Sequence, residues 1–159
     1  MNGIPEFIKI RPDRKPVDME ADQHELLHTA FQKSGLEATR KNGIFCSAKL
    51  SIARDWGNRT TIIFVKDGWT GTVFDKSKND YAFHELRTAG FLQNKEKDKI
   101  KNMQKVISDL EGRSFDTAEE VAELIDNDYM DVIITGDSYL ALDIKSRLTK
   151  EVLKILGLE

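Results

Sequence analysis

Short strand patterns and helix patterns follow one another irregularly along this chain of 159 residues. A doubly wound parallel sheet would require a regular alternation of strand and helix. The order therefore predicts an α+β fold, in one domain that spans residues 1–159, because a chain of this length fits a single core. The predicted elements are strands at 6–11, 44–47, 60–66, 68–74, 129–135 and 138–144, and helices at 22–34, 48–56, within 81–112, from 116 onward and near the C-terminus.

Two pairs of neighbouring strands are separated by short segments that contain glycine. The strand at 60–66 is followed by Gly68 and the strand at 68–74, which we expect to be its hairpin partner. The strands at 129–135 and 138–144 are joined by Thr135-Gly136-Asp137 and predict a second hairpin. The strand at 60–66 is apolar on both faces, so we expect it to lie inside a sheet and not at its edge.

Charge and hydropathy exclude several classes of protein. The 24 Lys and Arg against 27 Asp and Glu give a net charge of −3, which provides no general attraction to nucleic acid or to an anionic membrane. A local basic patch could still bind nucleic acid, which is therefore not excluded. The longest apolar runs have four or five residues, whereas a bilayer-spanning helix needs about 20. We expect no membrane association.

The N-terminus and the cysteine content predict the compartment. Met-Asn-Gly-Ile-Pro-Glu has neither the basic nor the apolar region of a secretion signal. The single cysteine, Cys46, agrees with a reducing compartment and on its apolar strand is expected to be a small buried side chain and not a nucleophile. We therefore expect a cytoplasmic protein.

The motifs of common nucleotide-binding folds are missing. The sequence contains neither G-x-x-x-x-G-K-[ST] nor G-x-G-x-x-G. His24-Glu25-Leu26-Leu27-His28 does match H-E-x-x-H, in which two histidines bind zinc and the glutamate acts as a base. A zinc hydrolase also needs a third ligand, and the only other histidine is His84. The alternative is a pair of histidines that border a packed helix face, so no metal ligand is predicted.

Asp131 interrupts the apolar strand pattern Tyr129-Met130-Asp131-Val132-Ile133-Ile134. A carboxylate in the middle of a buried strand needs a partner, because its desolvation otherwise costs several kcal/mol. Arg11, Arg14 and Arg40 are the candidate partners. Two interpretations remain open at this point, a structural ion pair and a carboxylate that faces a cation in a cleft.

Three blocks of the sequence together resemble a known family. They are Ile10-Arg11-Pro12-Asp13-Arg14-Lys15-Pro16 with Asp18 and the helix around His24, then Arg40-Lys41-Asn42-Gly43-Ile44-Phe45-Cys46-Ser47 with Ile52-Ala53-Arg54-Asp55-Trp56-Gly57, and finally residues 131–142. The blocks are similar to the first strand, the serine-bearing strand with its helix, and the glutamate-bearing strand and hairpin of the ADP-ribosyltransferase fold. The resemblance is to small bacteriophage members of the arginine-serine-glutamate type.

The resemblance implies two apposed, mostly antiparallel small sheets flanked by helices, and NAD as a substrate. It implies that Arg11 contacts an NAD phosphate or ribose, with Arg14 as the rival, and that Ser47 positions the nicotinamide ribose. Asp131 would occupy the position of the catalytic glutamate. By the same resemblance the NAD-binding residues would be Arg11, Arg14, Arg40, Phe45, Ser47 and Trp56. For Trp56 and Trp69, which both lie beside a glycine, core packing is the alternative.

The implied activity is mono-ADP-ribosylation of a host or phage macromolecule, in the host cytoplasm if a phage encodes the chain. Asp131 is one methylene shorter than glutamate, and Tyr129 stands where an arginine-modifying E-x-E motif would have its first glutamate. These departures favour an alternative function. The alternative is a non-catalytic protein of the same fold that binds a host or virion protein, and a zinc hydrolase built on His24 and His28 is the third interpretation.

Overall fold

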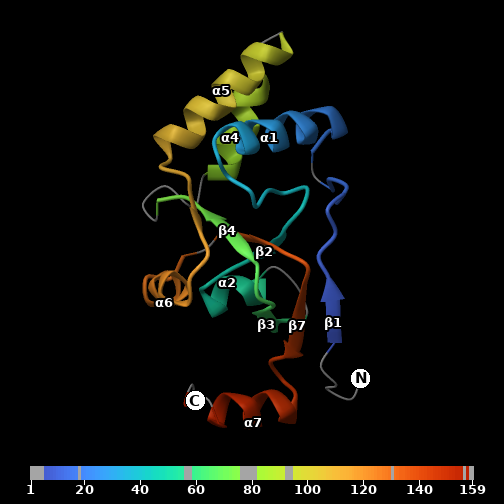
Figure 1. The fold of residues 1–159 in the computed structure, drawn as a ribbon, viewed down its shortest axis with the longest axis vertical. Coiled ribbons are helices and arrows are strands. Elements are labelled where there is room, and N and C mark those ends of the chain that lie inside the picture. The colour runs from blue at the N-terminus through green and yellow to red at the C-terminus, as the bar shows by residue number, and fades with distance from the viewer. Residues whose placement is uncertain are drawn as a thin grey trace.

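The computed structural model describes residues 6–17, 19–55, 59–75, 82–91, 95–129, 131–155 and 157. Helices and strands are mixed along this part of the chain, and every strand pair is antiparallel, which confirms the α+β class. The helices at 21–33, 82–91 and 96–109 lie together at one end of the molecule and the helix at 147–155 lies at the other end, with the strands between them (Figure 1).

The elements follow the predicted order closely. The strands are β1 (Glu6–Lys9), β2 (Ile44–Cys46), β3 (Thr61–Val65), β4 (Thr70–Val73), β5 (Arg113–Phe115), β6 (Val132–Thr135) and β7 (Ser138–Asp143). The helices are α1 (Ala21–Lys33), α2 (Leu50–Asp55), α4 (Ala82–Phe91), α5 (Glu96–Asp109), α6 (Ala118–Asp126) and α7 (Arg147–Ile155). Only β5 has no counterpart in the elements predicted from the sequence.

The strands form two antiparallel sheets, as expected. The three-stranded sheet has the order β1-β7-β3, and the four-stranded sheet has the order β2-β6-β4-β5. The expectation that the strand at 60–66 lies inside a sheet is wrong, because β3 is an edge strand and Phe64 is 37% exposed. The apolar side chains on its two faces have different surroundings, since Ile63 and Val65 face the core while Phe64 faces outward.

Neither predicted hairpin forms, because β3 and β7 belong to one sheet while β4 and β6 belong to the other. The pairing of β3 with β7 ends at Val65 and Tyr139, and the pairing of β4 with β6 begins at Thr70 and Thr135. Residues 66–69 therefore oppose residues 136–138, with one extra residue on the first segment. Such a bulge bends a strand pair sharply. The two sheets are thus built on one long, bent antiparallel pair.

Glycines permit this bend at two places. Gly68 has a φ of +87°, a backbone conformation that side chains with a Cβ rarely adopt. Gly136 lies against Trp69, whose Cα would be only 3.2 Å from a Cβ added at Gly136. Lys66 N–H donates to Ser138 carbonyl at 3.2 Å, which holds the two segments together at the bend. β1 joins them there, because Ile10 N–H donates to Asp137 carbonyl at 3.0 Å.

Two apolar clusters cover the two faces of the four-stranded sheet. On one face α1, α4 and α5 pack on the sheet and bury a cluster that includes Phe31, Phe74 and Ile133. On the opposite face Val132 and Ile134 pack with Ile63 and Val65 of the three-stranded sheet and with α6. The two sheets are therefore apposed across the second cluster, which agrees with the expected arrangement.

The helix ends follow ordinary capping chemistry. Gly35, with a φ of +76°, ends α1 as the sequence predicts. The capping box of α6 is formed by Thr117 and Glu120, whose side chains each bond the backbone N–H of the other. Thr117 Oγ1 accepts from Glu120 N–H, and Glu120 Oε2 accepts from Thr117 N–H, each at 3.2 Å.

Candidate functional site

The register of β2 and β6 brings two of the predicted catalytic residues together. Cys46 pairs with Val132, so Ser47 and Asp131 are the next residues of these two neighbouring segments. Beyond them Ala48 N–H donates to Tyr129 carbonyl at 2.9 Å, so the two segments stay paired past the ends of the strands. A hydroxyl and a carboxylate thus lie on neighbouring segments at one end of the four-stranded sheet.

Asp131 lies just before β6 and not in the middle of the strand as the sequence suggested. It is partly buried, whereas Val132, Ile133 and Ile134 in the strand are fully buried. A carboxylate at a strand end has a smaller desolvation cost than one within the strand, because solvent still reaches it. The position therefore suits a charged group that acts on a ligand.

The Ser47 hydroxyl takes part in the local turn that leads into α2. It accepts a hydrogen bond from Lys49 N–H at 3.1 Å and lies 3.2 Å from the Lys49 carbonyl. Serine forms such turns readily because its short side chain reaches the backbone two residues ahead. The turn fixes the side chain beside the segment that carries Asp131.

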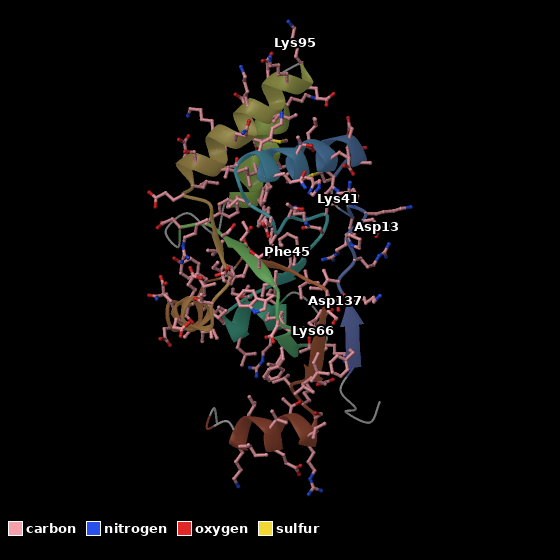
Figure 2. The ribbon with its side chains drawn as sticks, in the orientation of Figure 1. Asp13, Lys41, Phe45, Lys66, Lys95 and Asp137 are labelled. Carbon is pink, nitrogen blue, oxygen red and sulfur yellow. The ribbon has the colours of Figure 1, made fainter. Side chains whose placement is uncertain are left out.

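The Arg40 guanidinium lies beside two aromatic rings, one of which belongs to the middle residue of β2. Its guanidinium carbon is 5.0 Å from the centroid of the Phe45 ring and 5.4 Å from that of Phe83 in α4. The two rings meet edge to face, with centroids 5.1 Å apart. Alternation along β2 puts Phe45 and Ser47 on the same side of the strand. Phe45 lies near the middle of the molecule in Figure 2.

Phe83 is a member of this site that the sequence analysis missed. Its ring also meets Phe74 edge to face at 5.8 Å, and Phe74 meets Phe31 of α1 at 5.9 Å. Edge-to-face aromatic pairs fix ring orientation more firmly than aliphatic contacts do. The helix pattern within 81–112 predicted only that the residue lies on a helix, because no local signal links a helical phenylalanine to an arginine so distant in sequence.

Arg14 lies along the outer edge of β2 and not beside Arg40. Its guanidinium donates to Gly43 carbonyl at 2.6 Å, and its backbone N–H donates to Lys41 carbonyl at 2.8 Å. Burial raises the pKa of the Cys46 thiol to about 12, and the positive charge of Arg14 opposes this only weakly. Cys46 therefore stays protonated at neutral pH, which agrees with a packing role and not with that of a nucleophile.

Arg11 follows β1 and is well exposed. Its Nε lies 3.6 Å from Asp13 Oδ1, and both side chains face solvent, so the pair has little effect on stability. The three predicted arginines therefore have three different sets of partners. Trp56, the remaining predicted NAD-binding residue, lies outside the described residues. Trp69 packs against Phe115 at 5.6 Å in the core between the sheets.

His24 and His28 pack against the turn that precedes β2. His28 Nδ1 lies 2.8 Å from Thr39 Oγ1, and Glu25 forms an ion pair with Lys41 at 2.7 Å. Figure 2 shows Lys41 near the segment that carries Asp13. Burial lowers the pKa of both histidines, and the positive charges of Arg40 at His24 and of Lys41 at His28 lower these pKa values further. Both imidazoles are therefore held in the neutral form.

This arrangement gives the zinc interpretation no support. The Glu25 carboxylate, which would serve as the base, is in an ion pair with Lys41. One ring nitrogen of His28 is hydrogen-bonded to the Thr39 hydroxyl. Within the part of the chain that the structure describes, no group of three or more His, Cys, Asp or Glu side chains could hold a metal ion. The two histidines instead dock α1 onto the 39–42 turn.

Comparisons with protein families, with curated proteins and with solved structures found no match to this chain. Its function is therefore argued from its own residues. Among the described residues, no helix is both long enough and apolar enough to cross a bilayer.

Proposed function

We propose that this chain is an ADP-ribosyltransferase of the phage type, which uses NAD as a substrate to modify a host or phage macromolecule. The observation that carries the proposal is the pairing of β2 with β6, because Ser47 and Asp131 are the next residues of the two segments beyond the last pair. The two apposed antiparallel sheets are compatible with the fold that the sequence resembles. The proposal assigns the reaction to this end of the four-stranded sheet.

In the proposed reaction the bond between the nicotinamide nitrogen and the ribose C1′ breaks. Nicotinamide leaves with the bonding electron pair, and the ribose carbon develops positive charge. The Asp131 carboxylate would stabilise that charge through the ribose hydroxyls, because a fixed negative group is most effective where positive charge develops. The acceptor nucleophile then bonds to C1′ and loses its proton to Asp131 or to water.

The other predicted residues would bind NAD. The Arg40 guanidinium packs against the rings of Phe45 and Phe83, and these contacts would hold it in place for a pyrophosphate oxygen. Among the described residues Arg11 has one exposed ion pair, with Asp13, whereas the Arg14 guanidinium already bonds a carbonyl. Between these two rivals we therefore favour Arg11 as the second contact to the phosphates. Ser47 would hydrogen-bond the nicotinamide ribose.

The test is a release assay with variants of the carboxylate. Asp131→Asn keeps the size of the side chain and removes its charge, and we expect it to lower nicotinamide release from NAD by about 100-fold or more. Asp126→Asn, at an exposed carboxylate of α6, is the matched control and should keep wild-type activity. Equal release by wild type and Asp131→Asn would refute the assigned role.

One observation favours a second candidate, a non-catalytic protein of this fold that binds a host or virion protein. The Ser47 hydroxyl already contacts the backbone of Lys49, and aspartate reaches about one methylene less far than glutamate. A misplacement of about 1 Å can cost on the order of 100-fold in rate. Asp131→Glu separates the candidates, because a transferase should become faster in this variant, while a binding protein should release no nicotinamide in either form.

A further inference from the structure

The outer face of the three-stranded sheet carries two rows of side chains. Phe7 of β1 and Phe64 of β3 both pair with Leu140 of β7, so these three side chains form one row across the sheet. Lys9 pairs with Ser138, and Lys66 N–H donates to Ser138 carbonyl, which gives a second row of Lys9, Ser138 and Lys66. The aromatic row and the cationic row are about 7 Å apart, the repeat of two residues along a strand.

The aromatic row is open to solvent. Phe7 is 81% exposed and Phe64 is 37% exposed, whereas Ile63 and Val65 on the other face of β3 pack in the core. Exposed aromatic side chains on edge strands are a liability for a soluble protein, since they favour aggregation. Because Phe7 and Phe64 lie in register across one sheet, the outer face is a candidate binding surface.

The cationic row decides which kind of partner fits. Lys9 and Lys66 are the charged side chains at the described outward strand positions and at the residue after β3, and the Asp137 carboxylate lies beside them, accepting from the Ser138 hydroxyl at 3.2 Å. Lys66 lies 3.5 Å from Asp137, but both side chains are mostly exposed, so this ion pair is weak and a phosphate can replace it. Figure 2 shows Lys66 and Asp137 close together at the bend between the sheets.

We infer that this face binds a single-stranded nucleic acid, with bases on Phe7 and Phe64 and phosphates at Lys9 and Lys66. Exposed rings on an antiparallel sheet offer stacking platforms to any base, and lysines beside them follow the backbone. A duplex cannot use such a platform, because its bases are already stacked on one another. The inference is independent of the proposed transferase activity, since the face belongs to the other sheet.

The test measures binding of a fluorescein-labelled DNA strand of mixed sequence, and of the RNA of the same sequence, by anisotropy at low salt. Phe64→Leu keeps an apolar side chain of similar size but removes the ring, and we expect it to weaken binding roughly fivefold or more. Phe7→Leu should have a similar effect. Ile155→Leu, at a position of α7 that is 83% exposed, is the control and should leave the affinity unchanged.

The lysines are tested through the salt dependence. Lys9→Gln should weaken binding and reduce the slope of log affinity against log salt by about 0.7, the value for one lost phosphate contact on a single strand. Lys150→Gln on α7 should change neither quantity. Thermal unfolding of each variant shows whether the fold is intact.

Three results would overturn the inference. The first is no binding of either strand at low salt, and the second is equal affinity for the duplex. The third is an increase of molecular mass with protein concentration that Phe64→Leu abolishes while no oligonucleotide binds, which would assign the face to a second copy of this chain. NAD cleavage is not an outcome of these measurements, so either proposal can fail without the other.

Discussion

The two sheets share one bent pair of segments but differ in what covers them. The four-stranded sheet has α1, α4 and α5 on one face and the three-stranded sheet with α6 on the other. The three-stranded sheet is covered on its inner face, and on its outer face Leu142 is buried while Phe7 and Phe64 meet solvent. The covered sheet can therefore hold a defined constellation of polar groups at its strand ends, whereas the open sheet offers a surface.

The comparison also explains where charged groups occur. In the covered sheet Asp131 lies just outside β6 and Arg40 lies beside β2, because a charge within these strands would be desolvated on both faces. In the open sheet Lys9 and Lys66 follow the strand alternation, since water reaches the outer face. Asp131 and Arg40 thus lie outside the strands of one sheet, where Arg113 of the edge strand β5 is paired with Glu120 and Glu123, whereas Lys9 and Lys66 lie on the outer face of the other.

The largest difference should appear when the same substitution is made in the two regions. Phe31→Ala removes a fully buried ring under the covered sheet, and we expect it to lower the free energy of unfolding by about 3–5 kcal/mol. Phe7→Ala removes an 81% exposed ring and should cost less than about 1 kcal/mol. Urea unfolding measures both values. Similar losses would mean that the outer face is covered in solution.

A smaller loss is expected where β2 approaches β6. A Cβ at Gly43 would lie 2.5 Å from Ile133 Cγ2 and 3.0 Å from two backbone carbonyl oxygens. Gly43→Ala should therefore cost about 1–3 kcal/mol and push β2 away from β6. Amide hydrogen exchange should show faster exchange at Ala48, whose N–H bonds Tyr129 carbonyl. Unchanged exchange there would contradict the claim that this pairing holds Ser47 beside Asp131.

The N-terminal cap of α6 is expected to contribute to stability. Thr117→Ala removes the side-chain acceptor of Glu120 N–H and should cost about 1 kcal/mol. Thermal unfolding measures the loss, and Thr117→Ser is the control because it keeps the hydroxyl. If the two variants were equally stable, the hydroxyl would have no role in the cap.

The smallest effect is a pH dependence that belongs to the covered region. The pKa values of His24 and His28 are lowered from 6.5 in the folded state, so the unfolded chain binds protons more readily. Their contribution to stability is complete above about pH 6.5 and decreases as the pH falls through the folded values. The melting temperature should therefore fall between pH 7 and 5, and His28→Gln should reduce this fall. An unchanged slope in the variant would contradict the assignment.

The sequence predicted the elements better than their assembly. The strands at 60–66 and 138–144 are present at nearly the expected residues, because alternation and β-branched side chains are local signals. The predicted pairing partners of these strands were wrong. A glycine between two strand patterns gives the same local signal in a hairpin as in a bend from one sheet to the other. The extra residue in 66–69 cannot be recognised from the sequence, because it is defined only relative to the opposing segment 136–138.

The same limit applies to the candidate site. The resemblance singled out Ser47 and Asp131 together, and both residues directly adjoin the last pair of β2 and β6 at one end of the sheet. The sequence could not show that Arg14 bonds Gly43 at the edge of β2 or that Phe83 stacks on Arg40, because both contacts join segments distant in sequence. Local patterns identify candidate residues, whereas only the packed structure separates them into groups.

The most direct test of the transferase proposal is a calorimetric titration of the wild-type protein with NAD, with nicotinamide release followed in the same sample. We expect saturable binding together with release; Asp131→Asn should still bind NAD but release much less nicotinamide, and Arg40→Ala should bind NAD more weakly. Absence of binding at millimolar NAD would contradict the claim that the end of the four-stranded sheet is an NAD site.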